Sequence, residues 1–357
     1  MGRTEVIIRP MEGIPDIDIV DIPTSTMGVV EELLLVGAGT SSSVPSVACL
    51  AMDSDAACKV CLDAAGRLER SAEYTRKHGG PPAHLTGATR NRRTNPSAVL
   101  RYRHSDGTLH SILIDCGKTF YTNTERMLRA GVRVLDGVLL THGHADAILG
   151  LDDLRHWAGH FPSIQETVNV YCDADTFEVV KKAFPYLVDR RLATGGGEVP
   201  ALMFHTIESG VLATIGELEV MPVRLLHGCH SDGKDYFANG FRVGGLSYFS
   251  DISGVPKESQ QLVMGSPTEV LIVDCLLENK SYLSHYCWPQ TEPFIKELDP
   301  KTSVLVGMSH RIDYYGFQHR LDKERGIEIT DGVIGKLKYI PGRVLVGFDG
   351  MLLRFIH

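Results

Sequence analysis

The chain has 357 residues, of which 43% are hydrophobic and 22% charged, enough apolar material for a large core in one or two domains. Its 44 acidic and 36 basic residues give a net charge of −8, which argues against a surface built as a whole to bind nucleic acid. No run of about 18 apolar residues predicts a membrane span, and the start, MGRTEVIIRP, lacks the apolar core of a signal peptide. Eight cysteines spread over this length favour reduced thiols or a metal over disulfides, so we expect a cytoplasmic α/β protein.

The first segment, 1–31, carries three prolines among mixed apolar and acidic residues. We interpret it as an amino-terminal extension that precedes one domain of residues 32–357. A strand is predicted over 32–36, followed by a glycine pair and a serine-rich turn. That turn has neither Gly-x-Gly-x-x-Gly nor Lys-Ser/Thr, so we expect neither a dinucleotide site nor a P-loop.

Three cysteines follow, the last two with the spacing Cys-x-x-Cys: Cys49, Cys58 and Cys61. Thiolates at that spacing can bind one tetrahedral Zn²⁺ when a fourth ligand comes from elsewhere in the chain. Buried free thiols and a redox pair are the alternatives that the spacing leaves open.

The segment 67–104 is basic within an acidic chain, with nine Lys or Arg against two Glu. Such a run usually forms a solvated face, but guanidinium groups beside a pocket would also bind phosphate oxygens. Arg92 and Arg93, which precede a strand predicted over 98–102, are therefore the candidate substrate-binding residues.

The most informative turn is Thr-His-Gly-His-Ala-Asp, which follows a strand predicted over 137–140 and precedes an apolar helix pattern. It places His142, His144 and Asp146 on one short turn at the end of a buried strand. A lone His-x-His is more often an ordinary polar turn. The added aspartate and the flanking elements favour a metal site.

This strand and turn resemble the signature loop of the metallo-β-lactamase fold, whose full form is His-x-His-x-Asp-His. The resemblance covers roughly residues 33–357 and implies an α/β protein with an αββα sandwich. The chain is most similar to the phosphodiesterase branch, which includes the cyclic-phosphate phosphodiesterase of the carbon–phosphorus lyase pathway and the ribonuclease Z-like proteins.

The resemblance implies further ligands of the catalytic metal. A third histidine is expected at the end of the strand predicted over 218–226, where His227 is favoured and His230 is the competitor. Asp251 follows the strand predicted over 246–249, in a Ser-Asp pair that joins the metal site in the family. An ordinary turn histidine and a turn-capping aspartate are the simpler alternatives.

The related phosphodiesterases also hold a structural zinc, bound by three cysteines and by a histidine near the carboxyl end. The resemblance thus assigns Cys49, Cys58, Cys61 and His310 to one structural Zn²⁺. The family's first two cysteines stand closer together than Cys49 and Cys58 do.

Two positions depart from the family's pattern. Ala147 stands where the signature has its last histidine, and Gly307 stands where a further catalytic histidine would be. Both family residues bind the second metal ion, while the ligands of the first ion are all present. We therefore expect a mononuclear site, or a second site rebuilt with Asp146, Asp152 or Asp153.

The expected function is that of a metal-dependent hydrolase, with phosphodiesterase as the expected class. In such an enzyme, metal-bound hydroxide attacks phosphorus or a carbonyl carbon. Asp146 is the candidate catalytic residue, because it can hold or deprotonate the attacking water. Zn²⁺ is expected at both sites, with Mn²⁺ as the alternative at the catalytic one. The expected partner is a small phosphate-containing substrate, while a homodimer and nucleic acid stay open. A thioester or lactone hydrolase and a non-catalytic metal-binding protein are the alternative functions.

Overall fold

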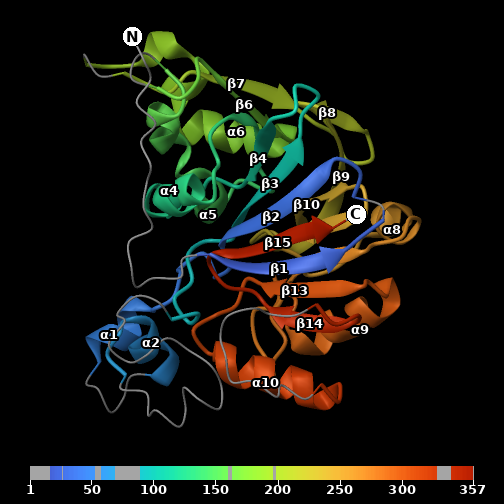
Figure 1. Cartoon of the computed structure of the whole chain (residues 1–357). Coiled ribbons are helices and arrows are strands. Elements are labelled where there is room, and N and C mark those ends of the chain that lie inside the picture. Colours follow the sequence, from blue (N-terminus) through green and yellow to red (C-terminus); the bar gives the residue numbers. More distant parts are fainter. Residues whose placement is uncertain are drawn as a thin grey trace, which may run out of the picture.

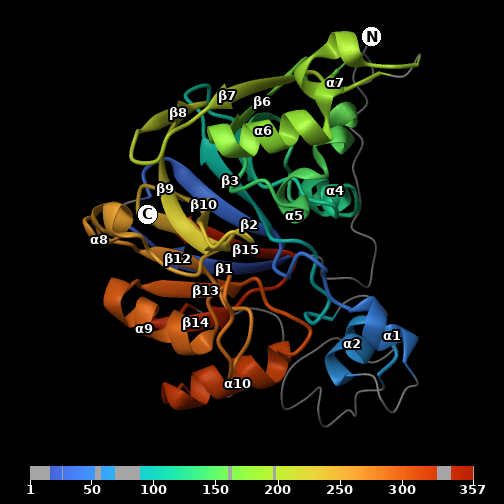
Figure 2. The ribbon, with the colours of Figure 1, turned by 180° about the vertical axis from the view of Figure 1, so that it is seen from behind.

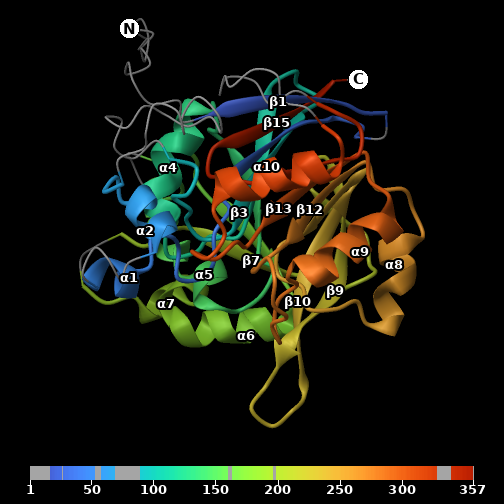
Figure 3. The ribbon, with the colours of Figure 1, turned by 90° about the horizontal axis from the view of Figure 1, so that it is seen from below.

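The computed structural model describes residues 17–25, 27–52, 58–68, 89–159, 163–195, 198–327 and 339–356. Two β-sheets pack against each other, with helices on both outer sides (Figures 1 and 3). The predicted αββα sandwich is confirmed.

The first sheet contains, in spatial order, β1 (Asp18–Pro23), β15 (Met351–Ile356), β2 (Val30–Gly37), β3 (Ser97–Arg103), β4 (Leu109–Ile114), β5 (Leu135–Leu139), β6 (Val168–Cys172) and β7 (Leu202–Thr206). β1 lies within the predicted extension and pairs in parallel with β15, so segments from the two ends of the chain lie side by side (Figure 1). The strands from β4 to β7 are parallel to one another. Their carboxyl ends therefore share one edge of the sheet.

The second sheet contains, in spatial order, β14 (Arg343–Val346), β13 (Thr302–Val306), β12 (Val270–Asp274), β11 (Leu246–Phe249), β10 (Asp235–Val243), β9 (Leu218–Cys229) and β8 (Ala213–Ile215). The strands from β11 to β14 are parallel. β9 and β10 form a long antiparallel hairpin, whose tip projects from the body of the molecule in Figure 3.

The described helices are α1 (Val47–Ala51), α2 (Lys59–Ala64), α4 (Phe120–Arg129), α5 (Ala145–Ile148), α6 (Ala174–Ala183), α7 (Pro185–Val188), α8 (Gln260–Met264), α9 (Trp288–Leu298), α10 (Tyr314–Glu324) and the 3₁₀ helices η1 (Leu151–His156), η2 (Arg190–Leu192) and η3 (Lys257–Ser259). α4 and α6 lie beside the first sheet, and α9 and α10 lie beside β13 and β14 (Figures 1 and 2). None of these helices combines the length and the apolar character that crossing a membrane requires.

The apolar helix predicted after the His-x-His turn is shorter than expected, because it is divided into α5 and η1. Gly150 lies between them, and its amide donates to the Cys116 carbonyl at 2.7 Å. A Cβ atom on Gly150 would lie 2.3 Å from the Gly117 carbonyl oxygen. The close approach of the two backbones therefore interrupts the helix at this glycine.

The core is divided by the first sheet into an inner and an outer part. Leu33 and Leu35 of β2 face the cluster between the sheets, which includes Val304. Leu34 points the other way, into the cluster that contains Phe120 of α4. A strand that is buried on both faces requires this pattern of apolar residues. The two sheets are thereby held so that their parallel strands end near one another.

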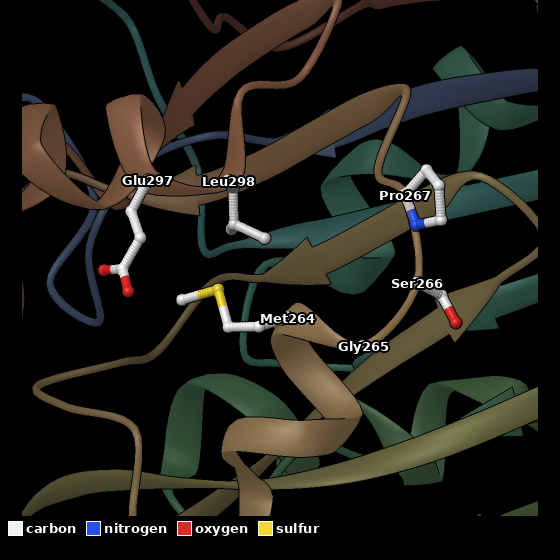
Figure 4. Close-up of a pocket in the computed structure, with 6 residues that line it drawn as sticks. All are labelled: Met264, Gly265, Ser266, Pro267, Glu297 and Leu298. Carbon is white, nitrogen blue, oxygen red and sulfur yellow. The ribbon is translucent and has the colours of Figure 1, made fainter.

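A hollow on the surface lies between α8 and the end of α9 (Figure 4). Its lining residues are Met264, Gly265, Ser266, Pro267, Glu297 and Leu298. They include no histidine and no cysteine. α8 also lies on the opposite side of the molecule from α5 and the His-x-His turn (Figures 1 and 3). The candidate metal ligands therefore lie away from this hollow, at the ends of the strands.

Candidate metal centre

The predicted ligands come from the ends of strands in both sheets. His142 follows β5 of the first sheet, and Asp251 follows β11 of the second. His227 lies near the end of β9. In α/β proteins, the carboxyl ends of parallel strands are where sites are usually built. The topology thus brings distant parts of the chain to one place.

The three predicted histidines converge on a common point. One nitrogen each of His142, His144 and His227 lies within 4.8 Å of the others. The Nε2 atom of His227 is 3.3 Å from the Nδ1 atom of His144. The Nε2 atom of His142 is buried and has no hydrogen-bond partner among the described residues. Such an atom is costly to bury alone, and three converging imidazole nitrogens fit a divalent metal ion.

Neighbouring groups orient two of these rings. The Nδ1 atom of His142 donates to the Thr141 hydroxyl at 2.8 Å, and that hydroxyl donates to Asp115 at 2.8 Å. The Nδ1 atom of His227 donates to the Ser284 carbonyl at 2.7 Å. Each of these two rings therefore keeps its Nε2 atom for an ion, as histidine ligands of metals usually do.

The protonation states also suit a cation. Burial lowers the pKa of His142 and His144, and it lowers that of His227 to about 4, so that all three rings are neutral at pH 7. Although burial opposes ionisation of Asp251, the neighbouring His142 and His227 hold its pKa at about 2. Burial and the charge of Asp251 raise the pKa of Asp146 to about 6. The site thus offers three neutral nitrogens beside the carboxylates of Asp146 and Asp251.

Two aromatic residues near these histidines escaped the sequence analysis. His285, from the loop between β12 and α9, has its ring centroid 4.8 Å from that of His227. Tyr236, from β10, stacks on His144 with ring centroids 4.7 Å apart. Neither residue belongs to a spaced motif. The one available signal for His285 was that it follows a strand predicted to be buried.

Asp152 and Asp153, two of the residues expected to rebuild a second site, lie on η1. Asp152 pairs with Arg155 and accepts a hydrogen bond from the Tyr186 hydroxyl at 3.1 Å. Neither aspartate belongs to a metal-binding cluster of the described residues. The structure does not bring them to the histidines.

The second predicted cluster is also assembled. Ligand atoms of Cys49, Cys58, Cys61 and His310 all lie within 4.8 Å of one another. The sulfurs of Cys49 and Cys58 are 3.7 Å apart, and each is 3.4 Å from the Nδ1 atom of His310. Three thiols and one imidazole at such distances form a donor set typical of a structural zinc site. We call these four residues the cysteine cluster.

Arg93 lies close to this cluster. Its side chain is completely buried, and its Nη2 atom donates to the carbonyls of Ser309 and Ile312 at 2.9 and 2.8 Å. A guanidinium held inside the protein in this way cannot reach a substrate, which corrects the expectation for Arg93. Arg92 is exposed. Much of the predicted basic segment, 69–88, lies outside the described residues.

Residues 110–308 match a protein-family model described as "Beta-lactamase superfamily domain". The matched part contains the three histidines and Asp251. A curated octanoyltransferase from Porphyromonas gingivalis (strain ATCC BAA-308 / W83) is 26% identical over 318 residues, which are 89% of this chain and 50% of that protein. The chain thus spans about half the length of this relative.

Two solved structures have a similar fold. The first, titled as a new diphosphatase from the PhnP family, has a TM-score of 0.63 and 24% identity, covering 91% of this chain and 98% of the other. The second, Zn²⁺-bound PqqB from Methylobacterium extorquens, has a TM-score of 0.60 and 14% identity, covering 90% and 99%. At these identities the likeness concerns the fold.

Proposed function

The chain belongs to the β-lactamase superfamily, with the metallo-β-lactamase fold, and from this membership we propose that it is a metal-dependent hydrolase of phosphodiesters. The observation that carries the proposal is the buried Nε2 atom of His142, which has no hydrogen-bond partner among the described residues and belongs to the cluster with His144 and His227. Zn²⁺ is the proposed ion here and in the cysteine cluster, with Mn²⁺ as the alternative here.

Each residue of the site would have a separate role in hydrolysis. His142, His144 and His227 would hold the ion, with Asp251 as the nearby carboxylate. A divalent ion in such a donor set supplies a Lewis acid that activates water near neutral pH. Asp146 would accept the proton of the attacking water, since a pKa of about 6 leaves most of it ionised at pH 7.

The choice of a phosphodiester rests on the resemblance to the phosphodiesterase branch and on the similar fold of the diphosphatase. The second candidate is a thioester or lactone hydrolase, which the named octanoyltransferase favours because that protein transfers an acyl group. However, this chain matches only half of that protein.

The test is to assay one preparation of the metal-loaded full chain on bis(4-nitrophenyl) phosphate, an octanoyl thioester and a lactone. We expect the phosphodiester to be hydrolysed, and His142→Ala to fall to background because it removes a ligand. His156→Ala is the matched control, since His156 is exposed and lies outside the metal-binding clusters. A clear preference for the acyl substrates would move the function to the second candidate. Inactivity on all three with a full metal content would indicate a non-catalytic metal-binding protein.

A further inference from the structure

The buried Asp274 and the half-buried His285 form a hydrogen-bonded pair beside the three histidines. Asp274 ends β12 and is completely inaccessible to solvent. Its Oδ2 atom accepts a hydrogen bond from the Nδ1 atom of His285 at 2.7 Å. Because Nδ1 is held by this hydrogen bond, Nε2 of His285 is the nitrogen left for an ion. Although burial opposes protonation, Asp274 and Asp251 raise the pKa of His285 to about 9, so an ion that binds Nε2 must displace a proton. A carboxylate that holds one nitrogen of a histidine in this way is the usual support of a metal-binding ring.

His285 also lies next to two of the predicted metal ligands. A ligand atom of His285 lies within 4.8 Å of those of His227 and Asp251. Asp251 has two carboxylate oxygens, and the Ser250 hydroxyl donates to one of them at 2.8 Å. Asp251 and His285 therefore face a common position beside His227, next to the three-histidine cluster.

Gly307 shows why the usual arrangement of the family is absent. A Cβ atom on Gly307 would lie 2.3 Å from the Oδ1 atom of Asp274, and the backbone there has a φ of +72°. A histidine side chain at this position and the carboxylate of Asp274 in its present place are therefore incompatible. Ala147, the other departure, is buried in the apolar cluster beneath the first sheet. At position 307, the space that a histidine side chain would need is occupied by the carboxylate of Asp274.

We propose that His285, oriented by Asp274, is a ligand of a second divalent cation that also binds Asp251. Asp251 would bridge this cation and the one held by the three histidines, because its carboxylate has two oxygens. The second site is then rebuilt from the loop that precedes α9, and it needs neither of the histidines that are missing at positions 147 and 307. This inference rests on the proposed metal-dependent function of the same site.

The test counts ions without measuring turnover. The full chain is stripped of active-site metal, equilibrated with Mn²⁺ and analysed for Mn and Zn separately. We expect two Mn²⁺ per chain in addition to the zinc of the cysteine cluster. Ions that share a carboxylate lie about 3.5–4 Å apart, so electron paramagnetic resonance should show a coupled pair rather than isolated Mn²⁺.

Variants then assign the ions. His285→Gln should lose one Mn²⁺ per chain and the coupled signal, while it keeps the zinc and the melting temperature. Asp274→Asn should weaken the second Mn²⁺ by about 10- to 100-fold, since it removes only the support of the ring. His156→Ala, in which an exposed histidine is lost, should bind as the wild type does.

A single Mn²⁺ in the wild type would overturn the proposal, and so would an unchanged count in folded His285→Gln. The outcome separates this inference from the proposed function. Two coupled ions in a protein that hydrolyses none of the esters would support the site and refute the function. One uncoupled ion in an active phosphodiesterase would refute the second site and support the function.

Discussion

The sulfur of Cys58 lies 3.4 Å from the Nδ1 atom of His310, although 252 residues separate the two in the sequence. An ion bound between them links α2 to the loop after β13, so its binding energy adds to the free energy of unfolding. Cys58→Ala should therefore lose about one zinc per chain and melt at least about 5 °C lower. Elemental analysis and calorimetry measure the two effects. Cys229→Ala is the control, because Cys229 is exposed and lies outside the cysteine cluster. If Cys58→Ala has the same zinc content and the same melting temperature as the wild type, Cys58 is an ordinary thiol and not a zinc ligand.

The remaining cysteines predict a pattern of alkylation. Burial raises the pKa of Cys172 to about 12, and it raises those of Cys116 and Cys275 well above their usual range. At pH 8, below these values, the three thiols stay protonated and unreactive. Iodoacetamide should modify Cys229 in the zinc-loaded protein, and treatment with a chelator should make Cys49 and Cys58 reactive as well. Burial raises the pKa of Cys61 to about 12, so this thiol should stay unmodified. Peptide mass spectrometry reads the sites. Rapid modification of Cys172 in the folded protein would contradict the prediction.

Arg93 and Arg92 should behave differently when each is replaced by alanine. Arg93→Ala removes a charged donor from the backbone carbonyls of Ser309 and Ile312, which should cost about 2–4 kcal/mol of unfolding free energy. Arg92 is exposed, so Arg92→Ala should change stability by less than about 0.5 kcal/mol. If Arg92 binds phosphate, as we still propose, its variant should raise KM for the phosphodiester. Urea denaturation and steady-state kinetics test both statements, and a stable Arg93→Ala would refute the structural role.

Gly307→Ala should be more destabilising than its backbone conformation alone explains. A left-handed conformation costs an alanine roughly 1–2 kcal/mol, and Gly342 provides the matched control because its φ is +73° and a Cβ there would meet no atom within 4 Å. Gly307→Ala should lose about 1–3 kcal/mol more than Gly342→Ala, because the new methyl group must displace the carboxylate of Asp274. Chemical denaturation gives the difference. Equal losses in the two variants would mean that Asp274 moves aside freely.

The fold and the first three histidines could be predicted because each depends on local patterns. An apolar strand followed by His-x-His-x-Asp gives both the position and the direction of His142 and His144. His227 likewise follows a clear strand pattern. The structure brings these three residues together as expected, and whether they bind an ion is a matter for the experiments above.

The rest depends on packing between distant segments. His285 takes its place from a hydrogen bond to Asp274, 11 residues earlier, across a loop without periodicity. Arg93 belongs to a run of polar and basic residues that is typical of an exposed face. It is buried only because the turn that contains Ser309 and Ile312 folds over it. Neither contact leaves a repeating signal in the sequence.

The pairing of β1 with β15 has a consequence for the synthesis of the chain. β15 lies between β1 and β2 in the sheet, yet it follows every other described strand along the chain. Until β15 has been synthesised, β1 lacks its partner, and β2 presents an open edge of the kind that promotes aggregation. The first sheet can therefore close only after all of these strands have been synthesised. A chain truncated before Met351 would leave Asp18–Pro23 without the strand that joins it to the sheet.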